Sequence, residues 1–349
     1  MKQNKFSIWW KSLPKYAVAL ILSAVILVGF FGLVLGGANI YFRAPIANYY
    51  KNSEKAFLLP GLNEGLVHQG MYYNAETDLF YITGYDKDHG ASPIYVVNQN
   101  KNQTVKRVYM LNEDGSAFTG HSGGIIVENG FIYIAGSEEN CIHVFNYTDL
   151  ENATDKANIK CVGRISLQVS ETDYISPAFI AYTPDGIITG EFVNDKGYAP
   201  VEDHIITTKA GDRNRAVAVL LPFDDSAPFK YSQTPSIAYS MPDQVQGFLV
   251  DGNNIYLSTS YGLAFSKIYK HDVTKANLST ISLLGENLST YELDSASLIK
   301  EYKTPPMAEQ MVKYQDKFYI LTESASGKYI FGKFVGGRHC YATDFNNMK

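Results

Sequence analysis

Seven polar side chains could form one binding site if the fold brings them together. They comprise three carboxylates, two imidazoles and two amides: Glu191, Glu309, Glu323, His68, His121, Gln69 and Gln246. Carboxylate oxygens are ligands that Ca²⁺ prefers, and an imidazole among carboxylates can hold a transition metal or act as a general base. We therefore expect a ligand-binding site, or a site for Ca²⁺ or another divalent cation with Glu191, Glu309 and Glu323 as its ligands.

These residues lie at the ends of short apolar segments that recur along the chain. Aromatic-rich segments begin at Phe80, Ile132, Ile187, Ile255 and Phe318, and each follows a similar first segment. Turn signals such as Pro184-Asp185-Gly186 separate the two members of a pair. The equivalent positions Gln69, Gly123, Pro177, Gln246 and Glu309 are 54, 54, 69 and 63 residues apart. This period predicts repeated antiparallel sheets.

The repeat predicts an all-β fold, a β-propeller of five blades. Six blades are the alternative, with a degenerate blade hidden in 192–245 or 262–306. Third strands are expected to begin at Pro93, Cys141, Ala216, Ser266 and Lys328. The last copy lacks a clear fourth strand, and 56–60 could supply it from the other end of the domain. That pairing would close the ring and remove two exposed sheet edges.

A propeller explains how distant polar residues could share one site. The first strand of each blade lines the central channel and the second runs back antiparallel, so the start of one and the end of the other reach the same face. Strand starts contribute His68, Gln69, His121, Ser122, Ser176, Gln244, Gln246 and Glu309; strand ends contribute Tyr85, Asp86, Asp88, Ser137, Glu138, Glu191, Ser260, Tyr261, Glu323 and Ser324. We expect a polar, acidic channel mouth.

A second interpretation of the mouth needs no ligand. Polar side chains at a propeller axis can simply bond water and the backbone of neighbouring blades. The segment Gly120-His121-Ser122-Gly123-Gly124 fits both interpretations, because its small residues let another backbone or a ligand approach closely. The two interpretations stay open at this stage.

The N-terminal part of the chain differs sharply from the rest. Residues 17–42 carry no charge, and four lysines but no acid precede them. As a helix of about 1.5 Å per residue, this segment is long enough for a hydrocarbon core of about 30 Å. The lysines predict a cytoplasmic N-terminus under the positive-inside rule. A cleaved secretory signal is the alternative, but its apolar core would be unusually long.

We therefore expect four parts in the chain. They are a cytoplasmic segment at 1–16, a transmembrane signal anchor at 17–42, a linker at 43–55 and an extracytoplasmic propeller domain at 56–349. The chain's net charge of −5 and pI near 5.8 argue against a nucleic-acid partner. Residues 43–349 are more acidic than the whole, with 26 basic against 35 acidic side chains.

The Gln-Gly pairs before first strands and the Gly120–Ile125 start of the second copy carry a family resemblance. Over about 60–335 the chain resembles membrane-anchored or secreted bacterial β-propellers of the NHL, strictosidine synthase-like and gluconolactonase-like group. The resemblance implies a ligand site at one channel mouth, in a group that includes lactonases, hydrolases, scaffolds and sensors. The metal-binding Glu, Asn and Asp set of gluconolactonase-like enzymes does not match position by position, which weakens the enzyme hypothesis.

The sequence favours a membrane-anchored module outside the cytoplasm that binds or senses a small-molecule, glycan or protein ligand at the propeller face. Tyrosines such as Tyr72, Tyr73 and Tyr198 keep a glycan among the candidates. The alternative is a metal-dependent extracytoplasmic hydrolase or lactonase with its site at the mouth.

The anchor hypothesis makes a topological prediction. Protease added to intact cells should degrade residues 43–349 and spare the lysine-rich N-terminus. Sequencing the N-terminus of the purified protein distinguishes an intact anchor from a cleaved signal. Full protection of the C-terminal part on intact cells, with digestion after lysis, would contradict both versions.

Overall fold

The computed structural model describes residues 9–10, 12–329, 331–335 and 337–348. The chain divides into two compact units, the first ending at Pro45 and the second running from Ile46. The first contains helix α2 (Lys15–Arg43), which has no buried residue. It is the one helix among the described residues that is long and apolar enough to cross a membrane, a test that a signal sequence also passes. The predicted apolar segment is thus helical.

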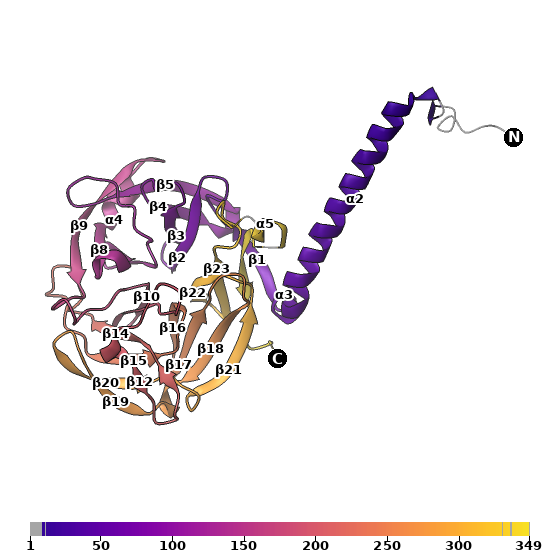
Figure 1. Cartoon of the computed structure of the whole chain (residues 1–349). Helices are drawn as coiled ribbons and strands as arrows, with labels where there is room; N and C mark the ends of the chain where they lie inside the picture. Colours follow the sequence, from indigo (N-terminus) through magenta and orange to yellow (C-terminus); the bar gives the residue numbers. More distant parts are fainter. Residues whose placement is uncertain (1–8, 11, 330, 336, 349) are drawn as a thin grey trace. The chain divides into compact units, whose positions relative to one another are not determined.

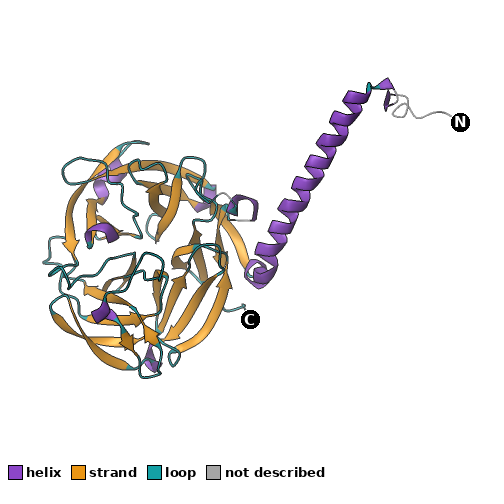
Figure 2. Ribbon diagram, viewed as in Figure 1, coloured by secondary structure: helices purple, strands orange, loops and turns teal. Residues whose placement is uncertain are grey.

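The second unit is built mainly from β-strands arranged around a centre, a β-propeller (Figures 1 and 2). One sheet joins two sets of four antiparallel strands through a parallel contact between β5 and β9. The first set is β2 (Leu66–Asn74), β3 (Leu79–Asp86), β4 (Pro93–Asn98) and β5 (Gln103–Leu111); the second is β6 (Ile125–Glu128), β7 (Phe131–Gly136), β8 (Cys141–Asn146) and β9 (Asn158–Ser166).

The later strands continue this pattern. A third set contains β10 (Phe179–Thr183), β11 (Gly186–Gly190), β14 (Ala216–Pro222) and β15 (Ile237–Met241); a fourth contains β16 (Val245–Asp251), β17 (Asn254–Thr259), β18 (Ser266–Asp272) and β21 (Leu298–Thr304). The last sheet runs β22 (Ala308–Tyr314), β23 (Lys317–Thr322), β24 (His339–Thr343) and β1 (Ser53–Leu58). The N-terminal strand β1 therefore completes the last sheet, as the sequence predicted, although it begins three residues earlier.

The two suspected locations of a hidden blade contain hairpins. Between 192 and 245, β12 (Ile206–Thr207) pairs with β13 (Arg213–Asn214). Between 262 and 306, β19 (Leu278–Leu283) and β20 (Glu286–Glu292) pair, and β20 lies parallel to β15 at the edge of the third set. The short helix η1 (Ala44–Ile46) spans the boundary between the two units. The described residues of the second unit also form the short helices α3 (Ala47–Lys51), η2 (Gln99–Lys101), η3 (Ser137–Glu139), α4 (Tyr147–Asn152), η4 (Glu202–His204), η5 (Val273–Lys275) and α5 (Gly332–Val335).

Most strand predictions are confirmed, but one third strand is wrong. Lys328 and Tyr329 lie in a turn, and the third strand of the last sheet is β24, eleven residues later. The segment beginning at Lys328 has the aromatic and β-branched composition of a strand, which misled the prediction. The third strand is instead the one that pairs with both β23 and the N-terminal β1.

The first strands of the five sets meet around the centre. Neighbouring contacts link β2 to β6, β6 to β10, β10 to β16, β16 to β22 and β22 back to β2. Glycines permit this close approach: a Cβ at Gly124 would lie 2.7 Å from the backbone nitrogen of Ile180, and one at Gly247 would lie 3.0 Å from the Cα of Gln310. Side chains at these two positions would push the strands apart.

The amide of Gln310 ties these first strands together. Its Oε1 accepts hydrogen bonds from the backbone nitrogens of Met71 at 2.9 Å and Ile125 at 3.1 Å. Its Nε2 donates to the carbonyl oxygens of Ile180 at 2.7 Å and Ile125 at 3.3 Å. Gln310 lies on β22 and is 2% exposed, so one buried side chain joins four strands. Both donors and both acceptor positions of the amide are used.

Removing the Gln310 amide should destabilise the propeller. In Gln310→Ala, buried backbone groups on three strands lose their partner, and each such group costs about 1–3 kcal/mol. Allowing for water entry, we expect a loss of about 2–4 kcal/mol in unfolding free energy. Urea unfolding of the full chain, followed by circular dichroism, measures this. The exposed Gln103→Ala is the matched control; equal midpoints for the two variants would contradict the role of Gln310.

Candidate functional site

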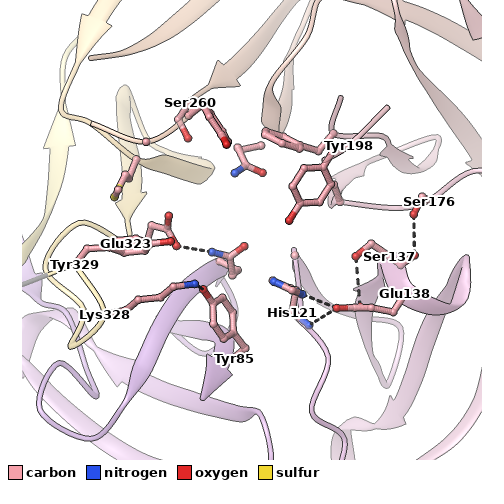
Figure 3. A pocket seen from close by; sticks show the side chains of 18 residues that line it. Tyr85, His121, Ser137, Glu138, Ser176, Tyr198, Ser260, Glu323, Lys328 and Tyr329 are labelled. Atoms are coloured by element: carbon pink, nitrogen blue, oxygen red, sulfur yellow. Dashed lines mark hydrogen bonds and ion pairs between the residues drawn. The ribbon is translucent and has the colours of Figure 1, made fainter. Parts of the chain in front are cut away.

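A cavity of about 510 Å³ opens at one end of the first strands. Its lining contains Gln69, Gly123 and Ala178, which lie two residues before Met71, Ile125 and Ile180, the three residues that bond to Gln310. It also contains Gln246, the residue before Gly247, which packs against Gln310. The Gln310 network therefore lies at the floor of the cavity. The predicted location of a site at a channel mouth coincides with this cavity, and Figure 3 shows its side chains.

Irregular pairing at the start of three first strands positions part of the lining. The register shifts between His68 and Gly70, between Val245 and Gly247, and between Ala308 and Met311. Such bulges re-aim side chains at strand ends. The residues inside these shifts include Gln69, Gln246 and Glu309, three of the positions aligned in the sequence repeat.

Two amide–carboxyl contacts lie at the mouth. Gln69 Nε2 donates to Glu323 Oε2 at 3.0 Å, and Gln246 Nε2 donates to Glu309 Oε1 at 3.4 Å. Burial raises the pKa of Glu309 well above its ordinary value, and the negative charge of Glu323 raises it further. Burial also raises the pKa of Glu323 to about 7, although Lys328, His121 and Gln69 oppose the shift. At neutral pH this carboxyl pair therefore carries fewer than two negative charges.

His121 and Glu138 form a second polar group in the cavity lining. His121 Nδ1 lies 2.5 Å from Glu138 Oε1, and the rings of Tyr85 and His121 are 4.7 Å apart. Burial alone would raise the pKa of Glu138, but hydrogen bonding to His121 lowers it to about 2. Lys328 Nζ donates to the Tyr85 hydroxyl at 2.6 Å. Glu138 is thus ionised and already has a partner.

Aromatic rings form another part of the lining. Phe192 and Tyr198 meet edge to face with centroids 5.2 Å apart, and Phe192 lies 6.4 Å from Tyr261. Tyr85 and Tyr329 also line the cavity. Figure 3 places Tyr198 on the opposite side from Tyr85 and Lys328. The cavity therefore combines aromatic faces with convergent hydrogen-bonding groups, the composition typical of small-molecule sites.

The predicted site residues separate into two sets. The cavity brings together Gln69, His121, Gln246 and Glu323. Glu309 is not part of the lining but accepts a hydrogen bond from Gln246, which is. Two others do not line it. His68 is fully buried, with Nε2 2.8 Å from the carbonyl of Pro60, and burial lowers its pKa to about 4. Glu191 is bonded to His204 at 2.9 Å and to the backbone nitrogen of Val217.

Some residues of the cavity lining fall outside the set that the sequence predicts. Phe192, Met307, Lys328 and Tyr329 belong to the cavity and were not among the predicted site residues. The sequence pattern predicts a strand at Lys328 and Tyr329. The preceding segment Ser324–Gly327 is rich in small residues, and this is the signal that indicates a turn instead. The partner of Glu191 comes from the insertion after β11, a contact that no local pattern reveals.

Comparison with known proteins does not assign a family. No family model matches the sequence, and the comparison with curated proteins gives no match. Among solved structures, an aldose sugar dehydrogenase from Streptomyces coelicolor in its PQQ-bound form aligns with a TM-score of 0.43 and 13% identity. The alignment covers 83% of this chain and 95% of that one.

Two other solved structures align more weakly. Glutaminyl cyclase from Myxococcus xanthus gives a TM-score of 0.36 at 8% identity, covering 73% of this chain and 85% of that one. Hsv2 from Kluyveromyces lactis gives 0.32 at 9%, covering 74% and 57%, so this chain spans less than two thirds of the length of Hsv2. Scores of this size carry no argument about activity, and the family resemblance noted in the sequence stays a prediction.

The raised pKa of Glu323 predicts a pH dependence of stability. Between pH 4.5 and about 7 the folded chain keeps a proton that the unfolded chain has released. Stability should therefore fall as pH rises through this window, by up to about 1.4 kcal/mol per pH unit for this group. In urea-unfolding measurements from pH 4 to 8, Glu323→Gln should remove the part of the pH dependence of the unfolding free energy that comes from Glu323.

Two comparisons isolate this effect. Subtracting the variant from the wild type cancels the buried histidines, whose lowered pKa values act with the opposite sign. The exposed Glu286→Gln should keep the wild-type slope. A Glu323→Gln slope equal to that of the wild type would show that Glu323 titrates normally.

Proposed function

We propose that the chain is a single-pass membrane protein whose propeller has five blades and binds a small, neutral, polyhydroxylated ligand such as a glycan in the mouth cavity. The closed cycle of contacts among β2, β6, β10, β16 and β22 supports five blades. The positive-inside pattern and α2 support a cytoplasmic N-terminus with the propeller outside. The protein then acts as a binding or sensing module.

We infer the class of ligand from the combination of aromatic faces with amide and carboxyl groups in the cavity. Rings such as Tyr198 and Tyr261 offer flat apolar surfaces for the C–H faces of a sugar ring. Hydroxyl groups need both donors and acceptors. Gln69 Nε2 already donates to the His68 carbonyl and to Glu323, so Gln69 offers its Oε1 as an acceptor, and protonated Glu323 offers a donor. Because Glu138 already bonds to His121 and the Glu309–Glu323 pair retains protons, the cavity does not favour a strongly charged ligand.

One observation favours the enzyme hypothesis as a second candidate. A carboxyl with a pKa near 7 suits general acid or base catalysis at neutral pH, and Glu323 has this property beside the buried Glu309. The metal set of Glu191, Glu309 and Glu323 stays a prediction. Glu309 and Glu323 interact with each other, whereas Glu191 would first have to leave His204.

Binding should depend on residues from both sides of the cavity. We expect calorimetry with a panel of neutral oligosaccharides to detect binding to the full chain in lipid nanodiscs, because glycoside detergents would themselves offer sugars. Tyr198→Ala and Gln69→Ala should each weaken binding at least about tenfold, a loss of about 1.4 kcal/mol. The exposed Tyr182→Ala lies outside the cavity lining and should bind normally.

The same samples separate the two candidates. A binding module leaves the oligosaccharides, and a parallel panel of lactones and esters, unchanged. A hydrolase would turn one of them over, lose that turnover in Glu323→Gln, and lose it in chelator if a metal is required. Absence of both binding and turnover, or binding that is equal in Tyr198→Ala and wild type, would refute the proposed site.

A further inference from the structure

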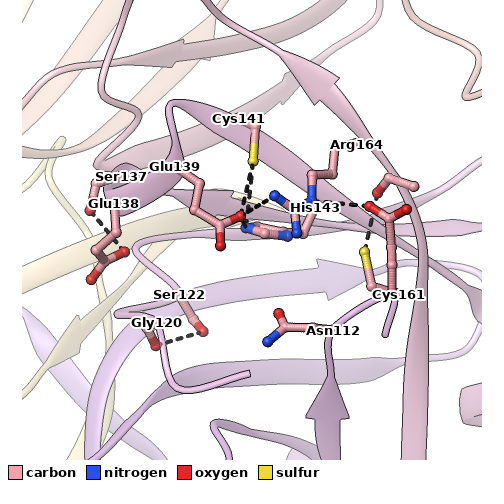
Figure 4. Close-up of polar contacts among 12 residues, drawn as sticks. Asn112, Gly120, Ser122, Ser137, Glu138, Glu139, Cys141, His143, Cys161 and Arg164 are labelled. Atoms are coloured by element: carbon pink, nitrogen blue, oxygen red, sulfur yellow. Dashed lines mark hydrogen bonds and ion pairs between the residues drawn. The ribbon is translucent and has the colours of Figure 1, made fainter. Parts of the chain in front are cut away.

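A cluster of metal-ligating side chains lies apart from the cavity lining, at the start of β8. Glu139, Cys141 and His143 form the one group of three possible ligand residues, among the described residues, whose ligand atoms all lie within 4.8 Å of one another. Figure 4 shows their side chains turned toward each other, with Arg164 alongside. None of the three belongs to the lining of the mouth cavity.

The spacing of the three ligand atoms fits a tetrahedral site. Cys141 Sγ is 3.5 Å from His143 Nε2, His143 Nε2 is 3.4 Å from Glu139 Oε2, and Cys141 Sγ is 4.0 Å from the same Oε2. Zn²⁺ bound to sulfur, nitrogen and oxygen at its usual distances separates such ligands by about 3.5 Å. A cation at the centre of this triangle would therefore need only small side-chain shifts.

The local fold holds the imidazole and the thiol in place. Alternation along β8 puts Cys141 and His143 on one face, and both are nearly fully buried, at 3% and 1% exposed. Gly136 on the neighbouring β7 leaves room for the ring, since a Cβ there would lie 2.6 Å from His143 Nε2. Glu139 is about two-fifths exposed and gives the cluster a route to solvent. The two buried ligands are thus preorganised and the third is adjustable.

The charges around the cluster can accept a divalent cation. Arg164 contacts Glu139 Oε2, and its Nε donates to Glu113 Oε1 at 3.0 Å. A carboxylate that binds a metal is commonly hydrogen-bonded by a second residue, so Arg164 can keep this contact. With Cys141 as thiolate, the three anions Glu113, Glu139 and Cys141 balance Arg164 and a doubly charged ion.

Hydrogen bonds alone leave part of the cluster unsatisfied in the tautomer that a metal requires, with the His143 proton on Nδ1. In that tautomer the single proton of Cys141 Sγ lies within reach of two acceptors, His143 Nε2 and Glu139 Oε2, and can serve one at a time. A cation accepts electron pairs from all three atoms together. We propose that Glu139, Cys141 and His143 bind one Zn²⁺ ion, leaving a fourth coordination position open. The mixed sulfur, nitrogen and oxygen ligands suit Zn²⁺ and do not suit Ca²⁺ or Mg²⁺.

Cobalt substitution tests the site directly. The full chain, purified in detergent with its thiols reduced, is titrated with Co²⁺, which reports a thiolate ligand and tetrahedral geometry through its absorption bands. We expect one equivalent to produce thiolate-to-cobalt and intense d–d bands, and Zn²⁺ to displace it. Cys141→Ser should abolish the thiolate band. His143→Gln should weaken Zn²⁺ affinity, measured against a chromophoric chelator, by at least about tenfold.

Cys161→Ser is the matched control, because Cys161 is another buried free thiol, on β9, and is outside the group. It should keep the bands and the affinity. Circular dichroism melting of each variant separates misfolding from ligand loss, and His143→Gln preserves the thiol should Cys141→Ser fold poorly. A wild-type protein without thiolate–cobalt bands, or bands that persist in a folded Cys141→Ser, would overturn the proposal.

Discussion

The propeller depends on the closure of its first strands around one buried amide. Gln310 uses both its donors and its acceptor oxygen on the backbones of β2, β6 and β10 while belonging to β22. An inner strand has no further strand on its axial side, so backbone groups there need other partners. Gln310 supplies them at a point where glycines bring the strands too close for larger side chains.

That closure also determines where the mouth cavity lies. With the axis filled at the level of Gln310, the residues immediately before it on each first strand become the base of a cavity. At that level the regular strand pairing is interrupted by bulges at Gln69, Gln246 and Glu309. The position of the cavity follows from the packing of the axis, whereas Tyr198, Tyr261 and Lys328, which lie outside the strands, form part of its lining.

The sequence predicts this architecture well because strand periodicity and turn residues are local signals. It located the starts of the second strands and the exchange of the N-terminal strand into the last sheet. It placed Gln69, Gln246 and Glu323 near one mouth because a repeat aligns equivalent positions. It missed the role of Gln310, adjacent to Glu309, since the alignment favoured the charged neighbour. It also could not foresee that His204 pairs with Glu191, because that contact joins an insertion to a strand end.

The charge at the mouth is the property that the sequence describes least well. Counting acids predicts an acidic site, and residues 43–349 do have more acids than bases. Folding changes that count: burial raises the pKa of Glu309 well above its ordinary value and moves the pKa of Glu323 to about 7, while Glu138 is paired with His121. A cavity whose carboxyls are protonated or paired can form hydrogen bonds but has little net negative charge from these groups. Such a cavity suits a neutral hydroxylated ligand better than a free cation. A cation site needs ligand atoms at fixed spacing, and among the described residues those of Glu139, Cys141 and His143 meet that requirement.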